Sequence, residues 1–140
     1  MTAVSRSIRR STRGHGHIVD LTAEVRDAVR DSGVRTGQAT LMVVGSTAAL
    51  TTLEYEPGLV NHDVVAALER IAPADGTYEH EKTWQDDNGH SHVGAALIGP
   101  SLALPVTDGD VPLGTWQQIV LVDLDTRPRD RILVLTIVGD

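Results

Sequence analysis

Apolar side chains recur at helical spacing in two parts of the chain. The first stripe consists of Leu21, Val25, Ala28 and Val29. Asp20 or Thr22 can cap the start of this helix, and Gly33 is well placed to end it in the left-handed conformation. The second stripe, within residues 59–71, consists of Val60, Val64, Leu68 and Ile71. We therefore predict two amphipathic helices.

The other apolar runs are short and bounded by glycine, proline or charged turns, which is typical of strands. The runs that we predict as strands are residues 4–12, 39–44, 49–55, 101–106, 117–123 and 132–138. The first is polar on one side and is predicted at a sheet edge, and the last three are predicted to form a meander. The predicted strands and helices are mixed in the first part of the chain, and only strands follow in the last part. This order predicts one α+β domain (residues 1–140) with a mainly antiparallel sheet.

Composition narrows the classes of partner and chemistry. The chain has 140 residues, no phenylalanine and no cysteine, so aliphatic side chains must fill the core and thiol chemistry is excluded. A formal net charge of −7 argues against nucleic acid as the main partner. No run approaches the length of a membrane span. We expect a soluble, cytoplasmic protein without a membrane or nucleic-acid partner.

A polar stretch at residues 78–105 separates the two apolar parts and contains three of the six histidines. It reads as a long loop that builds a site. In an extended segment, His90 and His92 project from the same face, so both imidazoles can reach one ion; in a helix they lie about 200° apart. His80 can close the site from across the loop, which gives the three imidazoles of an open zinc centre. The alternative is that these histidines are polar loop residues bonded to backbone carbonyls.

Carboxylates and small turns supply further candidates. Carboxylates that can orient an ion or move a proton are Glu54, Asp63, Asp86 and Asp87. Three turns place glycine next to hydroxyl or amide side chains, where an anion can come close. They contain Ser46 and Thr47, Ser101, and Gln117. Three arginines near the end of the chain can bind phosphate through their guanidinium groups, or can form a solvated turn: Arg127, Arg129 and Arg131. No nucleotide-binding glycine motif is present.

Taken together, these motifs resemble the YjbQ-like family. The matching segments, in order, are Ser46 to Leu59, Tyr78-Glu79-His80, Asn88 to His92, Gly99-Pro100-Ser101, Leu104-Pro105-Val106, Leu113 to Ile119 and Arg127 to Arg131. The resemblance implies a compact α+β domain with a β-sandwich core that assembles as a homotrimer. It also implies a pocket of histidines and Ser/Thr/Gln turns that holds a divalent metal ion, zinc or magnesium, and a sulfate or phosphate.

Members of the family are often described as secondary thiamine-phosphate synthases, which join hydroxymethylpyrimidine diphosphate to a thiazole phosphate. On this reading the metal ligands are His80, His90 and His92, and the residues that move a proton are Glu54, Asp63 and His80. The residues that hold the phosphorylated metabolite are Ser46, Thr47, Ser101, Gln117 and Arg129. The alternative is a trimeric protein that binds a metal or a phosphorylated metabolite without catalysis.

The chain departs from some relatives at two positions. Where they read His-Thr-Ser before the second strand, this chain has Gly45-Ser46-Thr47. Where they have asparagine in a TLNE-like run, it has Leu53-Glu54-Tyr55, and Glu54 takes the polar role.

Overall fold

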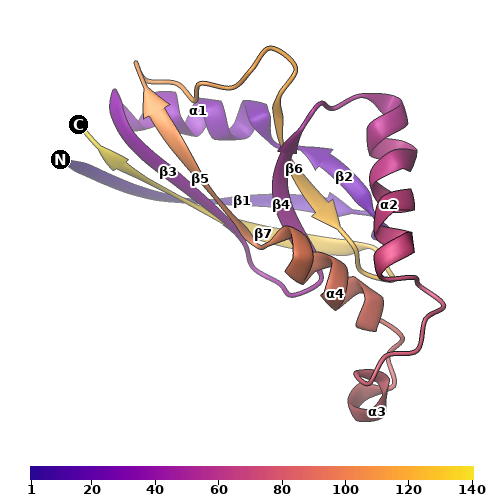
Figure 1. Cartoon of the computed structure of the whole chain (residues 1–140). Coiled ribbons are helices and arrows are strands. Elements are labelled where there is room, and N and C mark those ends of the chain that lie inside the picture. Colours follow the sequence, from indigo (N-terminus) through magenta and orange to yellow (C-terminus); the bar gives the residue numbers. More distant parts are fainter.

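Two antiparallel sheets lie face to face and helices cover their ends, as the computed structural model of all residues 1–140 shows (Figure 1). The strands are β1 (Thr2–Thr12), β2 (His17–Asp20), β3 (Thr36–Val43), β4 (Ala48–Leu53), β5 (Ser101–Thr107), β6 (Gln118–Asp123) and β7 (Arg129–Gly139). The helices are α1 (Thr22–Ser32), the π-helix η1 (Leu59–Asp63), α2 (Val64–Ile71), α3 (Glu81–Trp84) and α4 (Gly89–Ile98). This is the predicted α+β fold.

The core fills the space between the sheets and under α1. The larger sheet has the order β1-β7-β3-β5 and the smaller one β2-β6-β4. Strand β7 alternates strictly, with Leu133, Leu135 and Ile137 completely buried, whereas residues 119–123 of β6 are buried without alternation. A strand reads as continuously apolar when both of its faces are covered. The 19-residue main cluster contains only Val, Leu, Ile and Ala, which is the aliphatic core that the composition predicts.

The first predicted helix is confirmed. Val25, Ala28 and Val29 are buried in α1, and Leu21 is buried just before it. The Asp20 carboxylate accepts hydrogen bonds from the Thr22 amide at 2.9 Å and the Thr22 hydroxyl at 2.6 Å. Gly33 has a φ of 76° in the left-handed region, as predicted. The second helix is also present, as η1 followed by α2, but Ile71 is 65 % exposed and was wrongly predicted as buried. None of the helices is long and apolar enough to cross a membrane.

The last three strands do not form the predicted meander. β5 pairs with β3, β6 with β2 and β4, and β7 with β1 and β3. Successive strands therefore alternate between the two sheets, so that each sheet is assembled from strands that are distant in the chain. The edge position predicted for the first strand is confirmed.

The largest correction concerns residues 89–98, which form helix α4 where the sequence predicted an extended segment around His90 and His92. Small residues allow this helix to lie close to the sandwich: a Cβ on Gly94 would be 2.8 Å from Leu124 Cδ1. Residues two apart on a helix point in nearly opposite directions. The His-Ser-His motif therefore sends its two imidazoles to different sides of α4.

Candidate functional site

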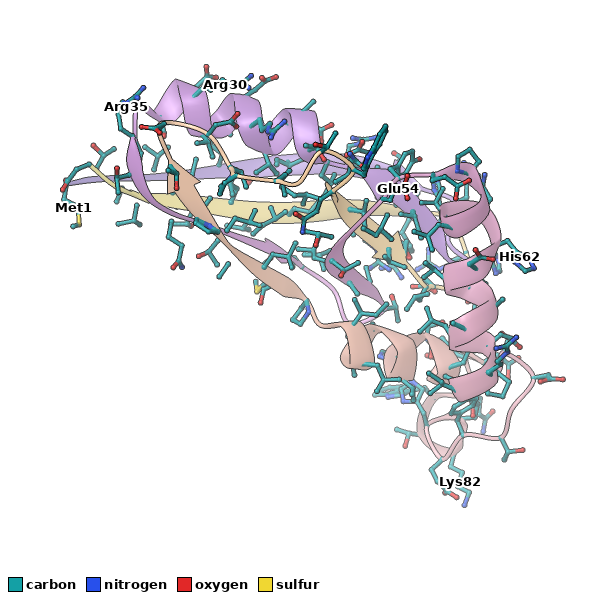
Figure 2. All side chains as sticks on the ribbon, turned by 45° about the horizontal axis from the view of Figure 1, so that its top comes forward. Met1, Arg30, Arg35, Glu54, His62 and Lys82 are labelled. Carbon is teal, nitrogen blue, oxygen red and sulfur yellow. The ribbon has the colours of Figure 1, made fainter.

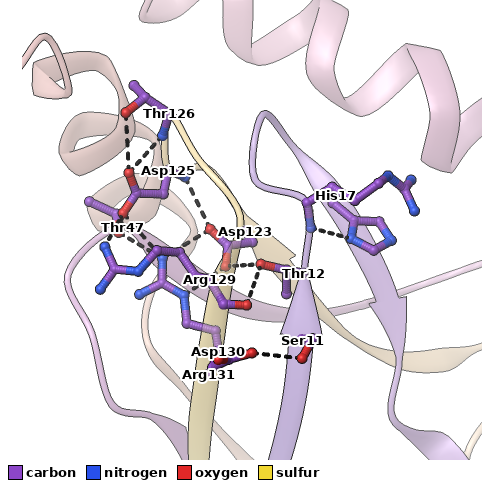
Figure 3. A network of polar contacts seen from close by, with 11 residues as sticks. Ser11, Thr12, His17, Thr47, Asp123, Asp125, Thr126, Arg129, Asp130 and Arg131 are labelled. Atoms are coloured by element: carbon purple, nitrogen blue, oxygen red, sulfur yellow. Dashed lines mark hydrogen bonds and ion pairs between the residues drawn. The ribbon is translucent and has the colours of Figure 1, made fainter.

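Six polar side chains gather where β7 begins, between the two sheets (Figure 3). We call them the buried ionic network: Thr12, Thr47, Asp123, Asp125, Arg129 and Arg131. Asp123 is completely buried and Arg131 is 3 % exposed, so both charges are removed from bulk water. Such burial costs several kcal/mol per ion unless pairing and hydrogen bonds offset it.

Hydrogen bonds within the network satisfy both carboxylates. Arg131 binds Asp123 with two bonds, from Nε–H to Oδ2 at 2.7 Å and from Nη2–H to Oδ1 at 2.9 Å. Nη2 also donates to the Thr47 hydroxyl at 2.7 Å, and this hydroxyl donates to Asp125 Oδ2 at 2.8 Å. Arg129 Nη1 donates to the same Asp125 oxygen at 2.6 Å. The carboxylates of the network therefore have their hydrogen-bond donors within the protein.

The network keeps its carboxylates ionised. Burial alone would raise the pKa of Asp123, but hydrogen bonds from Arg131 and Thr12 outweigh burial, so this pKa lies below its ordinary value of 3.8. The pKa of Asp125 is lowered in the same way: burial opposes, while the Thr47 hydroxyl and the Thr126 amide stabilise the charged form. Both groups are negative at neutral pH, as their bonded guanidiniums require.

The same aspartates anchor the turn at residues 14–17. The amide of His15 donates to the Asp125 carbonyl and that of Gly16 to the Asp123 carbonyl, both at 2.7 Å. His17 Nδ1 accepts the Arg13 amide at 3.0 Å. Burial, and then the positive charge of Arg13, lower the pKa of His17 below its ordinary 6.5. His17 is therefore neutral at pH 7 and structural.

The second polar cluster is a pair of imidazoles from His80, just before α3, and His92 on α4, which we call the histidine pair. Their ring centroids are 4.5 Å apart and the rings are tilted by 53°. His80 Nε2 lies 3.5 Å from Asp86 Oδ1. With its side-chain nitrogen toward these groups, Asn88 donates to Asp86 Oδ1 at 2.8 Å and to His80 Nε2 at 3.0 Å. A carboxylate beside an imidazole fixes the orientation of the ring.

Local backbone geometry brings these residues together. Gln85 and Asp87 both have a φ of 55°, a left-handed conformation that is uncommon outside glycine and folds the loop back after α3. The Glu81 carboxylate accepts the amides of Tyr78 at 3.1 Å and Gly89 at 3.2 Å and ties the loop to the start of α4. Non-glycine residues in this region cost about 1–3 kcal/mol each and cluster at functional sites.

An open groove begins beside His92. Its lining consists of Gly45, Ser46, Ala48, His92, Ala95, Ala96 and Pro100. The walls are small and mostly apolar, so the Ser46 hydroxyl and the His92 imidazole are its only polar side chains. Concave surfaces that are mostly apolar with a few polar groups are the usual form of small-molecule sites.

His90 faces a different space. It lines a half-enclosed cavity of about 160 Å³ between α2, α4 and the turn at residues 14–17, which His15 also lines. Its Nδ1 is buried and has no hydrogen-bond partner in the chain. The structure thus brings His80 and His92 together and places His90 in a different cavity.

The remaining predicted site residues are dispersed. Ser46 lies in the groove, whereas the side chains of Thr47 and Arg129 are engaged in the buried ionic network. Gln117 donates to Thr52 Oγ1 at 2.9 Å, at the far end of β4 from the groove. Ser101 is exposed at the start of β5.

The two predicted acids also lie elsewhere. Glu54 is exposed just beyond the far end of β4, and Asp63 is exposed on η1, where its Oδ1 lies 2.9 Å from His62 Nδ1. Figure 2 labels His62 at the right-hand edge of the molecule and Lys82, on α3, at its lower end. Within one chain, neither acid approaches the histidine pair.

The predicted metal centre needs three converging ligands. The chain contains no group of three His, Asp or Glu side chains arranged to hold an ion, and the helix separates His90 from His92. The three histidines of one chain therefore do not fit the predicted zinc or magnesium ion.

Sequence reasoning missed Asp123 and Asp125. Asp123 ends β6 after four consecutive apolar residues and Asp125 comes two residues later, and an acid at the end of a fully buried strand must be paired. Arg131 lies two residues before Leu133, so the period of two along β7 places it on the buried face of the strand. This periodicity could have identified Arg131 as a buried cation that pairs with these acids.

The fold and the groove define a small α+β sandwich protein with a histidine-bearing groove at the end of its smaller sheet. Residues 6–140 match the family model described as UPF0047 protein YjbQ-like. The chain belongs to this family.

Relatives in the family span most of the chain. A UPF0047 protein of Methanothermobacter thermautotrophicus is 35 % identical over 122 residues, 87 % of this chain and 82 % of the relative. UPF0047 protein YjbQ of Escherichia coli O157:H7 is 33 % identical over 125 residues, 89 % of this chain and 88 % of the relative.

Solved structures agree with the fold. A YbjQ-like protein of unknown function from Sulfolobus solfataricus superposes with a TM-score of 0.92 at 33 % identity, covering 99 % of this chain and 98 % of that one. A hypothetical protein from Aeropyrum pernix has a TM-score of 0.90 at 31 % identity, with 98 % and 99 % coverage. The family relationship and the sandwich are established together.

Proposed function

We propose that this protein is a transferase for phosphorylated heterocycles and that the histidine pair is its acid–base centre. The observation that carries the proposal is the contact between the His80 and His92 rings, 4.5 Å apart, at the mouth of the groove. Two imidazoles in contact can relay a proton, and Asp86 and Asn88 hold one of them in place. The reaction that we propose joins hydroxymethylpyrimidine diphosphate to a thiazole phosphate.

The histidine pair suits the departing diphosphate in this reaction. A carbon–oxygen bond of the pyrimidine substrate breaks, its electron pair leaves with the diphosphate, and the thiazole nitrogen forms the new bond to the same carbon. Stabilising the charge that develops on the leaving oxygen is usually the largest catalytic contribution. In this proposal an imidazolium N–H of His92 donates to that oxygen, and the ring of His80, oriented by Asp86, exchanges the proton.

The test is a thiamine-phosphate synthase assay of the wild type, His92→Ala, His80→Ala and the control His62→Ala. His62 is 78 % exposed on η1 and lies outside the groove, so its removal should leave the rate unchanged. We expect the loss of either member of the pair to lower the rate about 10²–10⁴-fold. Equal rates in all four proteins would rule out the acid–base role.

The second candidate is a binding protein that captures a phosphorylated metabolite without turning it over. Gly45, which stands where some relatives have histidine, favours it, because the groove then lacks a second ionisable side chain beside His92. Heat stabilisation by the pyrimidine and thiazole phosphates without any product, in protein purified with zinc and with magnesium, would favour this reading. Product formation would reject it.

A divalent metal stays a prediction. A metal-assisted reaction would require donors beyond the three histidines of one chain, which α4 holds apart. Elemental analysis of the wild type beside the His80→Ala/His92→Ala variant decides the point. Stoichiometric metal that only the variant loses would support the ion, and metal-free active protein would exclude it.

We propose that the protein associates with further copies of itself as a homotrimer. The outer face of the larger sheet supports this proposal. No helix covers this face, and its paired positions form three uncharged rows: Ala3-Val138-Gln38-Pro105, Ser5-Thr136-Thr40-Ala103 and Ser7-Val134-Met42-Ser101. Charged side chains are depleted in the centre of subunit interfaces, and these three rows contain none.

Self-association would also explain why the predicted site residues are dispersed. Gln117 and Glu54 lie roughly 13 Å along β4 from the groove, so a neighbouring copy is the means by which they could reach the histidine pair. Light scattering of the wild type and of Thr40→Lys tests the assembly. A trimer that the substitution dissociates supports it, and a monomeric wild type rejects it.

A further inference from the structure

The cavity between α2, α4 and the turn at residues 14–17 has no role in the proposed reaction. Helix α4 contributes His90 and Gly94 to this cavity, whereas it contributes His92, Ala95 and Ala96 to the groove. The two recesses have no lining residue in common. An apolar cavity of roughly 150 Å³ accommodates one benzene ring. The cavity beside His90, of about 160 Å³, is therefore large enough for a small ring compound.

The walls of this cavity change from apolar inside to polar at its opening. Most of its apolar and glycine residues are buried or half-buried: Gly16, Val65, Leu68, Ala72, Gly94 and Leu124. Of its polar side chains, His90 is half-buried, whereas His15 and Glu69 are exposed and border the opening. A recess of this form fits an amphipathic molecule, whose apolar ring enters while its polar group stays at the rim.

Glu69 gives the rim a negative charge. Its Oε1 accepts the Ala74 amide at 2.9 Å, which holds the side chain in place, and its Oε2 accepts no hydrogen bond within the chain. No lysine or arginine lines the cavity. An anion at the rim would therefore be repelled by the carboxylate, whereas an ammonium group would find a free acceptor there.

His15 provides a second acceptor on the rim. Its amide donates to the Asp125 carbonyl at 2.7 Å, so the turn that carries it is tied to the buried ionic network, and its imidazole makes no hydrogen bond within the chain. A neutral imidazole has one acceptor nitrogen. The rim thus presents acceptors to a ligand and no cationic donor.

We propose that this cavity is a second binding site, which takes a small organic cation that consists of one apolar ring and one ammonium group. The ring packs against Leu68, Ala72 and Leu124, and the ammonium group donates to Glu69 and His15. The net charge of −7 supports this choice, because it raises the concentration of cations near the surface. The site goes beyond the proposed function, since its ligand carries no phosphate and occupies a different recess.

The test is an amide NMR titration of the wild-type protein at pH 8 with benzylamine, benzyl alcohol and benzoate. These probes share one ring and differ in charge, and imidazoles are mostly neutral at this pH. We expect benzylamine to cause saturable shifts at Ala72, Gly94 and Leu124. Benzyl alcohol should bind about three- to fivefold more weakly, as expected for the loss of one exposed ion pair, and benzoate should not bind.

Two variants separate the ring pocket from the charge at its rim. Ala72→Leu puts a larger side chain at a buried wall and should lower benzylamine affinity at least about tenfold, whereas Ala67→Leu, on the exposed side of α2, should leave it unchanged. Glu69→Gln keeps the shape of the rim and should reduce benzylamine affinity to that of benzyl alcohol. Its control is Glu79→Gln, which is 83 % exposed outside the cavity.

Three results would overturn the site: benzoate that binds as tightly as benzylamine, shifts that avoid the cavity, or benzylamine affinity that Glu69→Gln leaves unchanged. Equal affinity in Ala72→Leu would reject the ring pocket. If Ala72→Leu does not fold, the order of the three probes and the exposed Glu69→Gln substitution decide. None of these measurements depends on the histidine assay of the proposed reaction.

Discussion

The buried ionic network and the histidine pair are both polar clusters, yet they differ in how many hydrogen-bonding groups are left free. In the network, every oxygen of Asp123 and Asp125 has at least one donor. In the histidine pair, His92 makes ring contact with His80 and has no hydrogen bond to its imidazole. A saturated cluster stabilises the fold, and an unsaturated one at the mouth of a groove is available to a ligand.

The largest expected effect is the loss of Arg131. Arg131→Met leaves Asp123 completely buried without its guanidinium and should lower the free energy of unfolding by about 3–5 kcal/mol. Urea unfolding measures this. The matched control is Arg127→Met on an exposed residue of the preceding turn, with an expected change within about 0.5 kcal/mol. Equal effects of the two substitutions would show that the network does not stabilise the fold.

A smaller loss is expected at Thr47, whose hydroxyl connects Arg131 to Asp125. Thr47→Val removes this connection and should cost about 1–3 kcal/mol in unfolding experiments, whereas Thr47→Ser should restore most of it. Ser46→Ala, one residue away and exposed, should leave stability unchanged. If Thr47→Val were as stable as the wild type, the hydroxyl would not be part of the network.

Acid provides a third, graded way to weaken the network. The folded-state pKa values of Asp123 and Asp125 are lowered, so the unfolded chain takes up protons first as the pH falls through 3.8. Their stabilisation is complete above pH 3.8 and is lost below it, by no more than about 1.4 kcal/mol per pH unit for each carboxylate.

His17 adds a separate step to the same pH series. Its pKa is also lowered, so stability is complete above pH 6.5 and declines as the pH falls below that value. Urea midpoints measured across this range should show the step in the wild type and not in His17→Gln. Stability that rises as the pH falls from 6.5 to 5 would contradict the lowered pKa of His17.

Local sequence patterns predicted single helices and strands well, because these depend on residues that are close together in the chain. The stripe ending at Gly33 defined α1, because apolar spacing and a left-handed terminus are local properties. The pairing of β5, β6 and β7 was wrong because strand partners are chosen by the face that each sheet buries, which the order along the chain does not encode.

The candidate site was predicted in part for a similar reason. The polar stretch did bring His80 to His92, but the His-Ser-His spacing was read with a period of two and α4 has a period of 3.6. The small residues Gly94 and Ala95, which let α4 pack on the sandwich, were the local signal for the helix. The roles of Thr47 and Arg129 depended on Asp125, nearly eighty residues from one of them, and only the fold reveals this partner.

The smallest effect on stability is expected at the histidine pair itself. His80 is 29 % exposed, and its contact with Asp86 is long at 3.5 Å, so His80→Gln and His92→Gln should each change the free energy of unfolding by less than about 1 kcal/mol. A double-mutant cycle should then give a coupling of about 0.5–1 kcal/mol for two tilted rings in contact. Coupling of several kcal/mol, as expected between Arg131 and Asp123, would mean that the histidine pair is a second structural network. Weak coupling together with loss of product formation would instead show that these imidazoles are retained for chemistry and contribute little to the fold.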